Sequence, residues 1–182
     1  MNAFFRVLTV FALGVGLATA WPGLSALARD GGASPAATAT APDFTGIDHW
    51  FNSPPLHMQD LRGKVVLVEF WTNECINCVH VLPHTKELYD KYAKDGLVVV
   101  GVHTPEYDEE RDPATVKAAI NRFGIDWPVA IDNQNATWNA WNNQFWPALY
   151  LVDPQGHVVY QHFGEGNYDT TEAKVRQLLG KG

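Results

Sequence analysis

One segment, VEFWTNECINCVHVLPHTKELYDKY at residues 68–92, indicates both the fold class and the chemistry of this chain. It contains the two cysteines of the 182-residue sequence, Cys75 and Cys78, with two residues between them. The β-branched, apolar run KVVLVEFW at residues 64–71 leads into them and is typical of a strand buried on both faces. Apolar side chains then recur at helical spacing. The cysteine pair is therefore predicted to lie where a buried strand passes into a helix.

The rest of the chain alternates between strand and helix patterns. Strands are predicted at residues 96–103, 147–153 and 158–164, and helices at residues 112–124, 135–142 and 170–179. Asp112 and Pro113 suit the first turn of their helix, and Pro154-Gln155-Gly156 suits a hairpin turn. Alternation of this kind implies parallel strands joined by crossovers. The predicted fold class is α/β, with a central mixed β-sheet and helices on both faces.

The position of the cysteines suits thiol chemistry better than a structural role. A helix N-terminus offers partial positive charge and free N–H groups, which stabilise a thiolate at Cys75. Cys78, one turn further on, can attack a mixed disulfide formed at Cys75. A purely structural disulfide is a poor explanation, because closing so short a loop removes little entropy from the unfolded chain.

The N-terminus has the pattern of a secretory signal peptide, assigned to residues 1–28. Arg6 is the only charged residue in this range, and residues 7–20 are largely apolar. That run is shorter than the roughly 20 residues that a membrane-spanning helix needs. We expect cleavage after Ala28, with an uncleaved membrane anchor as the alternative.

Residues 29–42 are low in complexity and are predicted to form a flexible linker, so the folded domain is expected at residues 43–182. The formal charge of −7 argues against nucleic acid as a partner. Export would place the domain in the periplasm or elsewhere outside the cytoplasm, where disulfides are permitted. No cofactor and no metal are expected.

On these residues the sequence resembles the thioredoxin superfamily. VEFWTNECINCVHVLP at residues 68–83 is similar to the active-site segment of that superfamily. Within it, the chain looks like the exported TlpA-like branch and is similar to the thioredoxin-like (redoxin) domain of DipZ-type proteins. That pattern is echoed by four stretches: NSPPLHMQDLRGKVVLVEFWTNECINC, GLVVVGVHTPE, WPALYLVDPQG and GEGNY. The resemblance covers about residues 43–180 and implies a thioredoxin-like fold and thiol:disulfide oxidoreductase activity.

The resemblance also implies roles for three catalytic residues. Cys75 looks like the exposed nucleophile and Cys78 like the buried resolving thiol, so the pair would form the redox-active disulfide. Glu69 falls where thioredoxins keep a buried acid that assists proton transfer. A carboxylate inside so apolar a strand is unfavourable unless it is protonated or paired. Burial would therefore raise the pKa of Glu69 and suit it to act as a base near neutral pH.

Three further residues are expected to bind substrate. Pro147 matches the cis-proline that lies beside the disulfide and helps to hold an extended substrate. Trp71 matches an aromatic residue near the site, and Trp146 stands directly before Pro147. Trp138 and Trp141 fit core packing and the border of the active site equally well. The implied partners are disulfide-bearing client proteins and a membrane thiol transducer of the DsbD or CcdA type.

Two other functions are compatible with parts of the sequence. A thiol peroxidase of the peroxiredoxin kind would need Pro-x-x-x-Thr-x-x-Cys; Thr72 is present, but Val68 takes the place of the proline. A copper chaperone of the Sco kind would need a third ligand, which His80, His84 or His162 would have to supply. For the histidines, solvent-exposed or packing roles are the more common outcome.

The direction of electron flow depends on how well the reduced form is stabilised. The helix N-terminus favours a thiolate at Cys75, whereas the carboxylates of Glu69 and Glu74 oppose it, and a less stabilised thiolate makes a better reductant. A reductase is the preferred interpretation. Glu74 and the acidic run at residues 106–112 are expected to lie in solvated loops.

Overall fold

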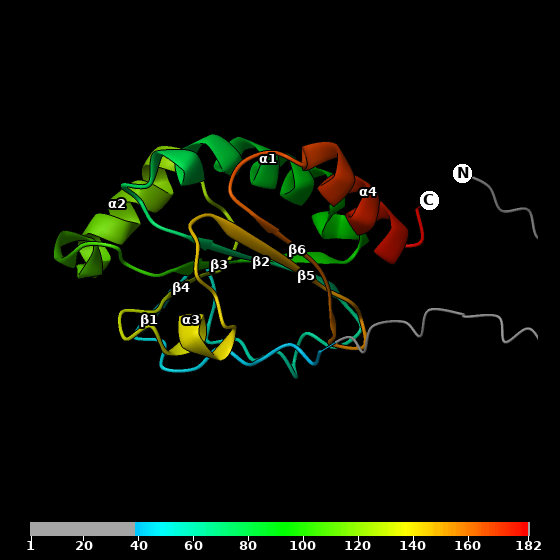
Figure 1. Ribbon diagram of the computed structural model, residues 1–182, viewed down its shortest axis with the longest axis horizontal. Helices are drawn as coiled ribbons and strands as arrows, with labels where there is room; N and C mark the ends of the chain where they lie inside the picture. The colour runs from blue at the N-terminus through cyan, green and yellow to red at the C-terminus, as the bar shows by residue number, and fades with distance from the viewer. Residues whose placement is uncertain (1–38, 182) are drawn as a thin grey trace, which may run out of the picture. The chain divides into compact units, whose positions relative to one another are not determined.

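A computed structural model describes residues 39–181, and all of the predicted signal peptide and most of the predicted linker lie outside them. Within these residues six strands form one sheet, in the order β1-β4-β3-β2-β5-β6 (Figure 1). The strands are His49–Phe51 (β1), Val65–Trp71 (β2), Leu97–His103 (β3), Val129–Ile131 (β4), Ala148–Val152 (β5) and Val158–Phe163 (β6). The helices are Ile76–Tyr92 (α1), Pro113–Phe123 (α2), Ala136–Ala140 (α3) and Tyr168–Leu178 (α4), with 3-10 turns at Ala93–Asp95 (η1) and Asp108–Arg111 (η2).

Strand β2 lies near the middle of the sheet and leads directly to the cysteines. It pairs in parallel with β3 and antiparallel with β5, so the sheet is mixed as predicted. All seven of its residues are buried, because helices or loops cover both faces. Because β2 is paired on both edges and covered on both faces, the position of the turn that leads from it to the cysteines is well fixed.

Two apolar layers cover the sheet. On one face, Val65 and Leu67 pack with side chains from α1, α2 and α4. On the other, Val66, Val68 and Phe70 pack against α3 and the segment before β2. Figure 1 shows the three longer helices above the sheet and the short α3 below it. Helices on both faces were predicted, and the fold class is confirmed.

Local sequence chemistry explains the element boundaries well. The Asp112 side chain accepts the N–H of Ala114 at 2.9 Å and caps α2, and Gly124 ends that helix in the left-handed conformation. Gly96, with φ of 108°, ends the turn after α1. The predicted hairpin is the antiparallel pair β5–β6. These boundaries depend on neighbours in sequence, which is why they could be predicted.

Two features at the N-terminal side differ from expectation. The sequence did not predict β1, a strand of only three residues that pairs antiparallel with β4. Contacts with the domain also begin before Asp43: Thr40 forms a β-bridge with His157, and the Ala41 N–H donates to the Gly156 carbonyl at 2.9 Å. Both features depend on partners at least 78 residues away in the sequence. Among residues 39–181, no helix has the length and apolarity needed to cross a membrane.

Candidate active site

Cys75 occupies the N-cap position of α1, directly after the β2 strand and its short turn. Its backbone is extended, with φ of −75° and ψ of 107°, and its side chain is half-buried. The sulfur accepts the backbone N–H of Cys78 at 3.2 Å. A helix N-terminus has unsatisfied N–H groups, and here one of them points at the Cys75 sulfur. The predicted setting for an attacking thiolate is therefore present.

Cys78 lies in the first turn of α1 and has no exposed surface. Both cysteines are free thiols. Burial raises the pKa of Cys78 well above its usual range, and the hydrogen bond with Cys75 and the charge of Glu69 act in the same direction. Cys78 therefore keeps its proton until a base removes it, whereas Cys75 is the cysteine that solvent and other molecules can reach.

Glu69 lies on β2 and is buried, with 1% of its surface exposed. Neither carboxyl oxygen has a hydrogen-bond partner among the described residues. Burial raises the pKa of Glu69 to about 7, and the neighbouring Thr85 hydroxyl acts in the opposite direction without cancelling the shift. The carboxyl can therefore exchange a proton near neutral pH, as the sequence led us to expect.

Trp146 and Pro147 directly precede β5, whose first residue, Ala148, pairs with Phe70 near the end of β2. The Trp146–Pro147 peptide bond is cis. The Pro147 carbonyl accepts the N–H of Gly164 at 2.9 Å, and the half-buried Trp146 indole donates to the Thr104 carbonyl at 3.0 Å. These bonds hold the two residues between β3 and the loop after β6.

Trp71 does not fit the substrate-binding role expected of it. It is the last residue of β2, only 1% exposed, and it packs edge to face on His103 with ring centroids 5.2 Å apart. A client protein cannot contact a side chain so deeply buried. The Trp71 side chain lies on the face of the sheet that α1 covers, where it is part of the hydrophobic core.

The other tryptophans near the site are mainly core residues. Trp138 and Trp141 are buried on the α3 side of the sheet, where both contact Phe70. Trp138 also packs on Trp146, with ring centroids 4.2 Å apart. The core interpretation of these two residues is correct, and Trp138 also supports Trp146.

The acidic run at residues 106–112 was expected to be a solvated loop, and for Glu110 that expectation is wrong. Glu110 is buried, and its carboxylate accepts hydrogen bonds from the Thr72 hydroxyl and from the N–H groups of Glu74, Glu106 and Tyr107. Burial alone would raise the pKa of Glu110, but these hydrogen bonds outweigh it and hold the pKa below the usual range. A buried carboxylate with this many donors anchors the turn that precedes Cys75.

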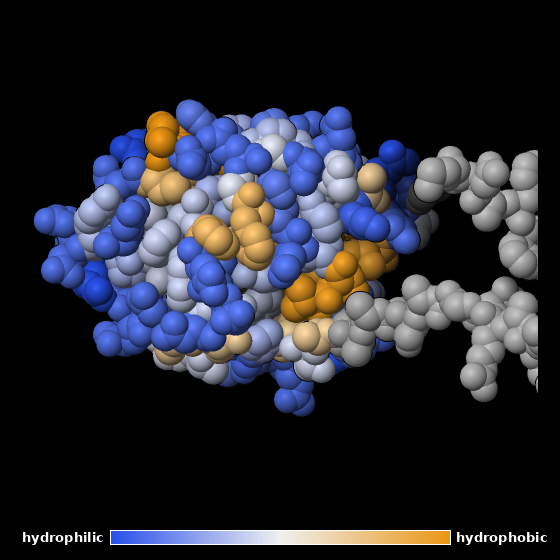
Figure 2. Space-filling view, in the orientation of Figure 1, coloured by the Kyte–Doolittle hydropathy of each residue, from blue (hydrophilic) through white to orange (hydrophobic). Residues whose placement is uncertain are grey.

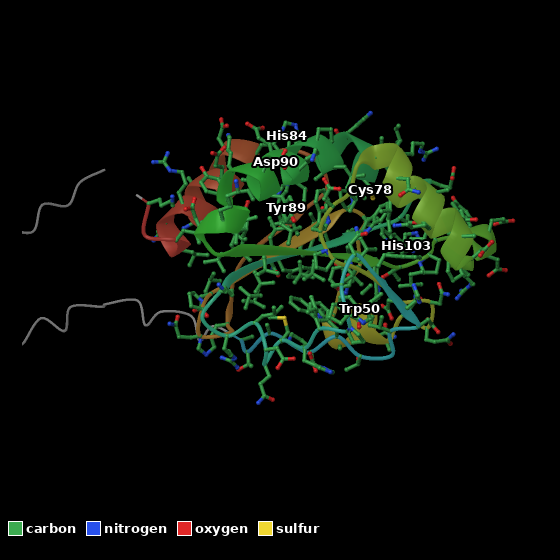
Figure 3. The ribbon with its side chains drawn as sticks, turned by 180° about the vertical axis from the view of Figure 1, so that it is seen from behind. Trp50, Cys78, His84, Tyr89, Asp90 and His103 are labelled. Carbon is green, nitrogen blue, oxygen red and sulfur yellow. The ribbon has the colours of Figure 1, made fainter. Side chains whose placement is uncertain are left out.

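His103 belongs to the same buried cluster. Its Nε2 lies 3.0 Å from Asn73 Oδ1, and burial lowers its pKa to about 4, so the ring is neutral near pH 7. Figure 3 shows His103 and Cys78 at the same end of the sheet. The sequence analysis missed this cluster. The available signal was that β2 and β3 are parallel neighbours, so polar residues at their carboxyl ends must meet.

The histidines that could have supplied a metal ligand have other contacts. His80 Nδ1 lies 3.2 Å from Glu165 Oε1, and the His84 ring stacks on Tyr168 with centroids 3.5 Å apart. His162 hydrogen-bonds to the loop that follows β6. In the described part of the chain, no group of three or more His, Cys, Asp or Glu side chains is arranged to hold a metal ion.

The fold and the site together define a thioredoxin-like domain with a Cys-x-x-Cys dithiol at the start of its first long helix. The chain belongs to the AhpC/TSA family, which residues 37–161 match. The predicted placement in the thioredoxin superfamily, on the TlpA-like branch, is confirmed.

Three relatives illustrate this placement. The chain is 48% identical to the protein DipZ of Mycobacterium tuberculosis over 153 residues, which are 82% of this chain and 22% of DipZ. It is 30% identical to the thiol-disulfide oxidoreductase YkuV of Bacillus subtilis, covering 77% of this chain and 94% of YkuV. A crystal structure of a thioredoxin-like superfamily protein, 32% identical, superposes with a TM-score of 0.73 over 79% of this chain and 98% of that one. The predicted enzyme class, thiol–disulfide oxidoreductase, is confirmed for the domain.

Proposed function

We propose that this protein is an exported thiol:disulfide oxidoreductase that reduces disulfides in client proteins. One observation carries the proposal: the half-buried Cys75 sulfur accepts an N–H at the start of α1, while Cys78 and Glu69 lie buried behind it. This arrangement separates an attacking thiol, a resolving thiol and a base. An attacking thiol and a resolving thiol carry out two successive disulfide exchanges, and a base assists the second by removing the proton of the resolving thiol.

The reaction proceeds in two exchanges. The Cys75 thiolate attacks a client disulfide, so a Cys75–client S–S bond forms and the other client sulfur leaves as a thiolate and takes a proton from solvent. Glu69 then accepts the proton of Cys78, whose thiolate attacks the Cys75 sulfur. The Cys75–Cys78 disulfide forms and the second client sulfur leaves. The client gains two electrons, and the cysteine pair loses two.

The direction of electron flow is supported by the surroundings of the buried thiol. Strong oxidants of this class are those whose reduced form is stabilised. Here burial keeps Cys78 as a neutral thiol, so the reduced form gains no stabilisation from a thiolate at this position. Equilibration of the cysteine pair with glutathione buffers tests the proposal. A reduction potential near about −270 mV fits a reductase, whereas one near about −120 mV would make the protein an oxidant.

Two cysteine variants test which thiol attacks the client and which resolves the mixed disulfide. With Cys78→Ser, the mixed disulfide between Cys75 and a client cannot be resolved and should accumulate on non-reducing gels. With Cys75→Ser, no mixed disulfide should form, because the buried Cys78 is inaccessible. Exchange activity that survives Cys75→Ser would refute the proposal.

Export and partners follow from the same proposal. The signal-peptide pattern at residues 1–28 would send the domain to the periplasm or a comparable compartment. There the oxidised pair must be reduced again, and a membrane thiol transducer of the DsbD or CcdA type would supply the electrons. Trapping with the Cys78→Ser variant in cells that possess such a transducer would identify both client and electron donor.

The peroxidase alternative is disfavoured by the geometry around Thr72. In the peroxidase motif this threonine stands three residues before the reactive cysteine, but here its hydroxyl donates to Glu110 and is occupied there. Val68, in place of the motif proline, lies within β2. Peroxide consumption by the reduced protein should therefore be no faster than that of the Cys75→Ser variant, and a clear Cys75-dependent excess would revive the alternative.

A further inference from the structure

A pocket lies between α1 and α4, and the buried Glu69 forms part of its lining. Its volume is about 40 Å³, enough for a few water molecules. Glu69 lines it from β2, His84 from α1, His162 from β6, and Tyr168 and Glu172 from α4. Since neither Glu69 oxygen has a hydrogen-bond partner among the described residues, the pocket is where this carboxyl can meet water.

Two of the titratable groups along this pocket are already engaged. The Glu172 carboxylate accepts the Tyr92 hydroxyl at 2.6 Å and pairs with Lys91 at 3.2 Å, and these contacts hold its pKa below the usual range. His162 Nε2 lies 3.1 Å from the Glu165 carbonyl, and its Nδ1 lies 3.2 Å from the Asn167 side-chain nitrogen. Taking up a proton at Nδ1 would break the bond with Asn167. Glu172 and His162 are therefore both held by hydrogen bonds to neighbouring residues.

His84 differs from them. Its ring is stacked on Tyr168 with 16° between the planes and 3.5 Å between the centroids, which fixes it at the pocket. Neither of its ring nitrogens hydrogen-bonds to another side chain in the described part of the chain. An imidazole takes up and releases protons between about pH 5 and 8. Figure 3 shows His84 on the same helix as Cys78, on the side of the sheet opposite Trp50.

We propose that His84 relays protons between Glu69 and solvent through this pocket. The inference rests on the proposed function, in which Glu69 takes the proton of Cys78. The Glu69 carboxylic acid then releases that proton to water in the pocket, His84 accepts it on a ring nitrogen, and the imidazolium passes it to solvent. When the disulfide is reduced again, the same path runs in reverse. His84 acts through Glu69 and does not touch the reacting sulfurs.

The test follows the Glu69 proton directly in the oxidised protein, where no exchange of disulfides takes place. A rapid pH jump from 6 to 8, followed by infrared absorption of the protonated carboxyl, gives the rate at which Glu69 loses its proton. The Glu69→Gln variant identifies the band. His84→Gln keeps a planar side chain without a titrating ring, and His84→Ala leaves room for added imidazole. His80→Gln is the matched control, since His80 lies one turn earlier on α1, pairs with Glu165 and does not line the pocket.

We expect both His84 variants to slow proton loss from Glu69 by about tenfold or more, while His80→Gln stays near the wild-type rate. Added imidazole should restore the rate in His84→Ala, a result that a merely structural role would not produce. Unchanged rates in both His84 variants, or no rescue by imidazole, would overturn the proposal. A protein that relays protons in this way but exchanges no disulfides would refute the proposed function instead, so the two failures are distinguishable.

Discussion

Glu69 has no charged neighbour directly opposite it on the strands beside it. In the sheet register it stands opposite Gly101 on β3 and Leu149 on β5, and neither residue carries a charge. The high pKa of Glu69 therefore results from burial and not from a like-charged neighbour on the sheet. Its ionisation should be visible in the stability of the whole protein.

We predict that Glu69→Gln stabilises the protein selectively at high pH. The unfolded carboxyl ionises near its ordinary pKa of 4.5 and the folded one at about 7, so the wild type loses stability as pH rises through this window. The free energy of unfolding of the variant relative to wild type should increase by roughly 3 kcal/mol between pH 4 and pH 8. Urea denaturation at both pH values measures it. A difference that does not change with pH would show that Glu69 titrates normally.

Gly101 makes room for two indoles on the α1 side of the sheet. A β-carbon at this position would stand 3.0 Å from Trp71 Nε1 and 3.4 Å from Trp127 Nε1, and neither ring can move far in a packed core. We predict that Gly101→Ala destabilises the protein by about 1–3 kcal/mol. Thermal unfolding measures the loss, and tryptophan fluorescence should shift as the indoles are displaced. Unchanged stability and fluorescence would contradict this packing.

At the level of secondary-structure elements, η2 determines the shape of the turn that holds Cys75. Glu110 joins η2 to the Thr72–Glu74 turn, and the N–H of Glu74 donates to its carboxylate at 3.1 Å. Helix α1 and strand β2 are thus linked through a third element that is distant in sequence. The start of α1 should move if this link is removed.

We predict that Glu110→Ala lowers the free energy of unfolding by about 2–4 kcal/mol, because it leaves buried donors without an acceptor. Disulfide exchange through Cys75 should also slow by about tenfold, since the cysteine is no longer held in place. Glu109→Ala is the control: Glu109 is exposed and should change stability by less than about 0.5 kcal/mol. Equal effects of the two substitutions on stability and exchange rate would argue against an anchoring role for Glu110.

Across the whole molecule, two buried groups respond to pH in opposite directions. Burial lowers the pKa of His103 to about 4, so the unfolded state binds the extra proton and stability rises with pH up to the ordinary histidine value of 6.5. Burial raises the pKa of Glu69 to about 7, so stability falls with pH above 4.5. Over the shared window the two slopes cancel.

We therefore predict that single substitutions expose a pH dependence that the wild type hides. Between pH 4.5 and 6.5 the stability of Glu69→Gln should rise with pH, that of His103→Gln should fall, and that of the double variant should follow the wild type. Urea midpoints at several pH values give all four curves. Parallel curves for the two single variants would rule out the compensation.

A structural feature could be predicted from the sequence when the residues that form it are close together in the chain. The cysteine pair, the Asp112 cap and the β5–β6 hairpin depend on neighbours in the chain, and each was predicted. Glu110 and Trp71 were misjudged because their burial depends on tertiary contacts. In β2, where both faces are covered, hydrophobic periodicity gives no sign of which way a side chain points. Because apolar residues occupy both faces of β2, the same pattern that predicted the strand could not predict the face on which Trp71 lies.

The surface near the site has apolar side chains within a largely hydrophilic exterior. Figure 2 shows apolar groups in the region where β6 lies in Figure 1, and the exposed large apolar residues at the site end of the sheet include Phe145 and Phe163. The Phe145 and Phe163 rings are 5.2 Å apart. Phe145 stands two positions before Pro147, so under the proposed function a client at the cis-proline would also meet aromatic rings.

The segment at Ala39–Ala41 has a consequence for orientation. This segment forms a β-bridge with His157 and a hydrogen bond with Val158, where β6 begins. Strand β6 pairs antiparallel with β5, and β5 pairs antiparallel with β2, so β6 and β2 run in the same direction. Cys75 follows the end of β2, and the two points therefore lie at opposite ends of the sheet. Seven residues of β2 span roughly 20 Å. The described chain therefore enters the domain at one end of the sheet, and the reactive sulfur of Cys75 lies at the other end.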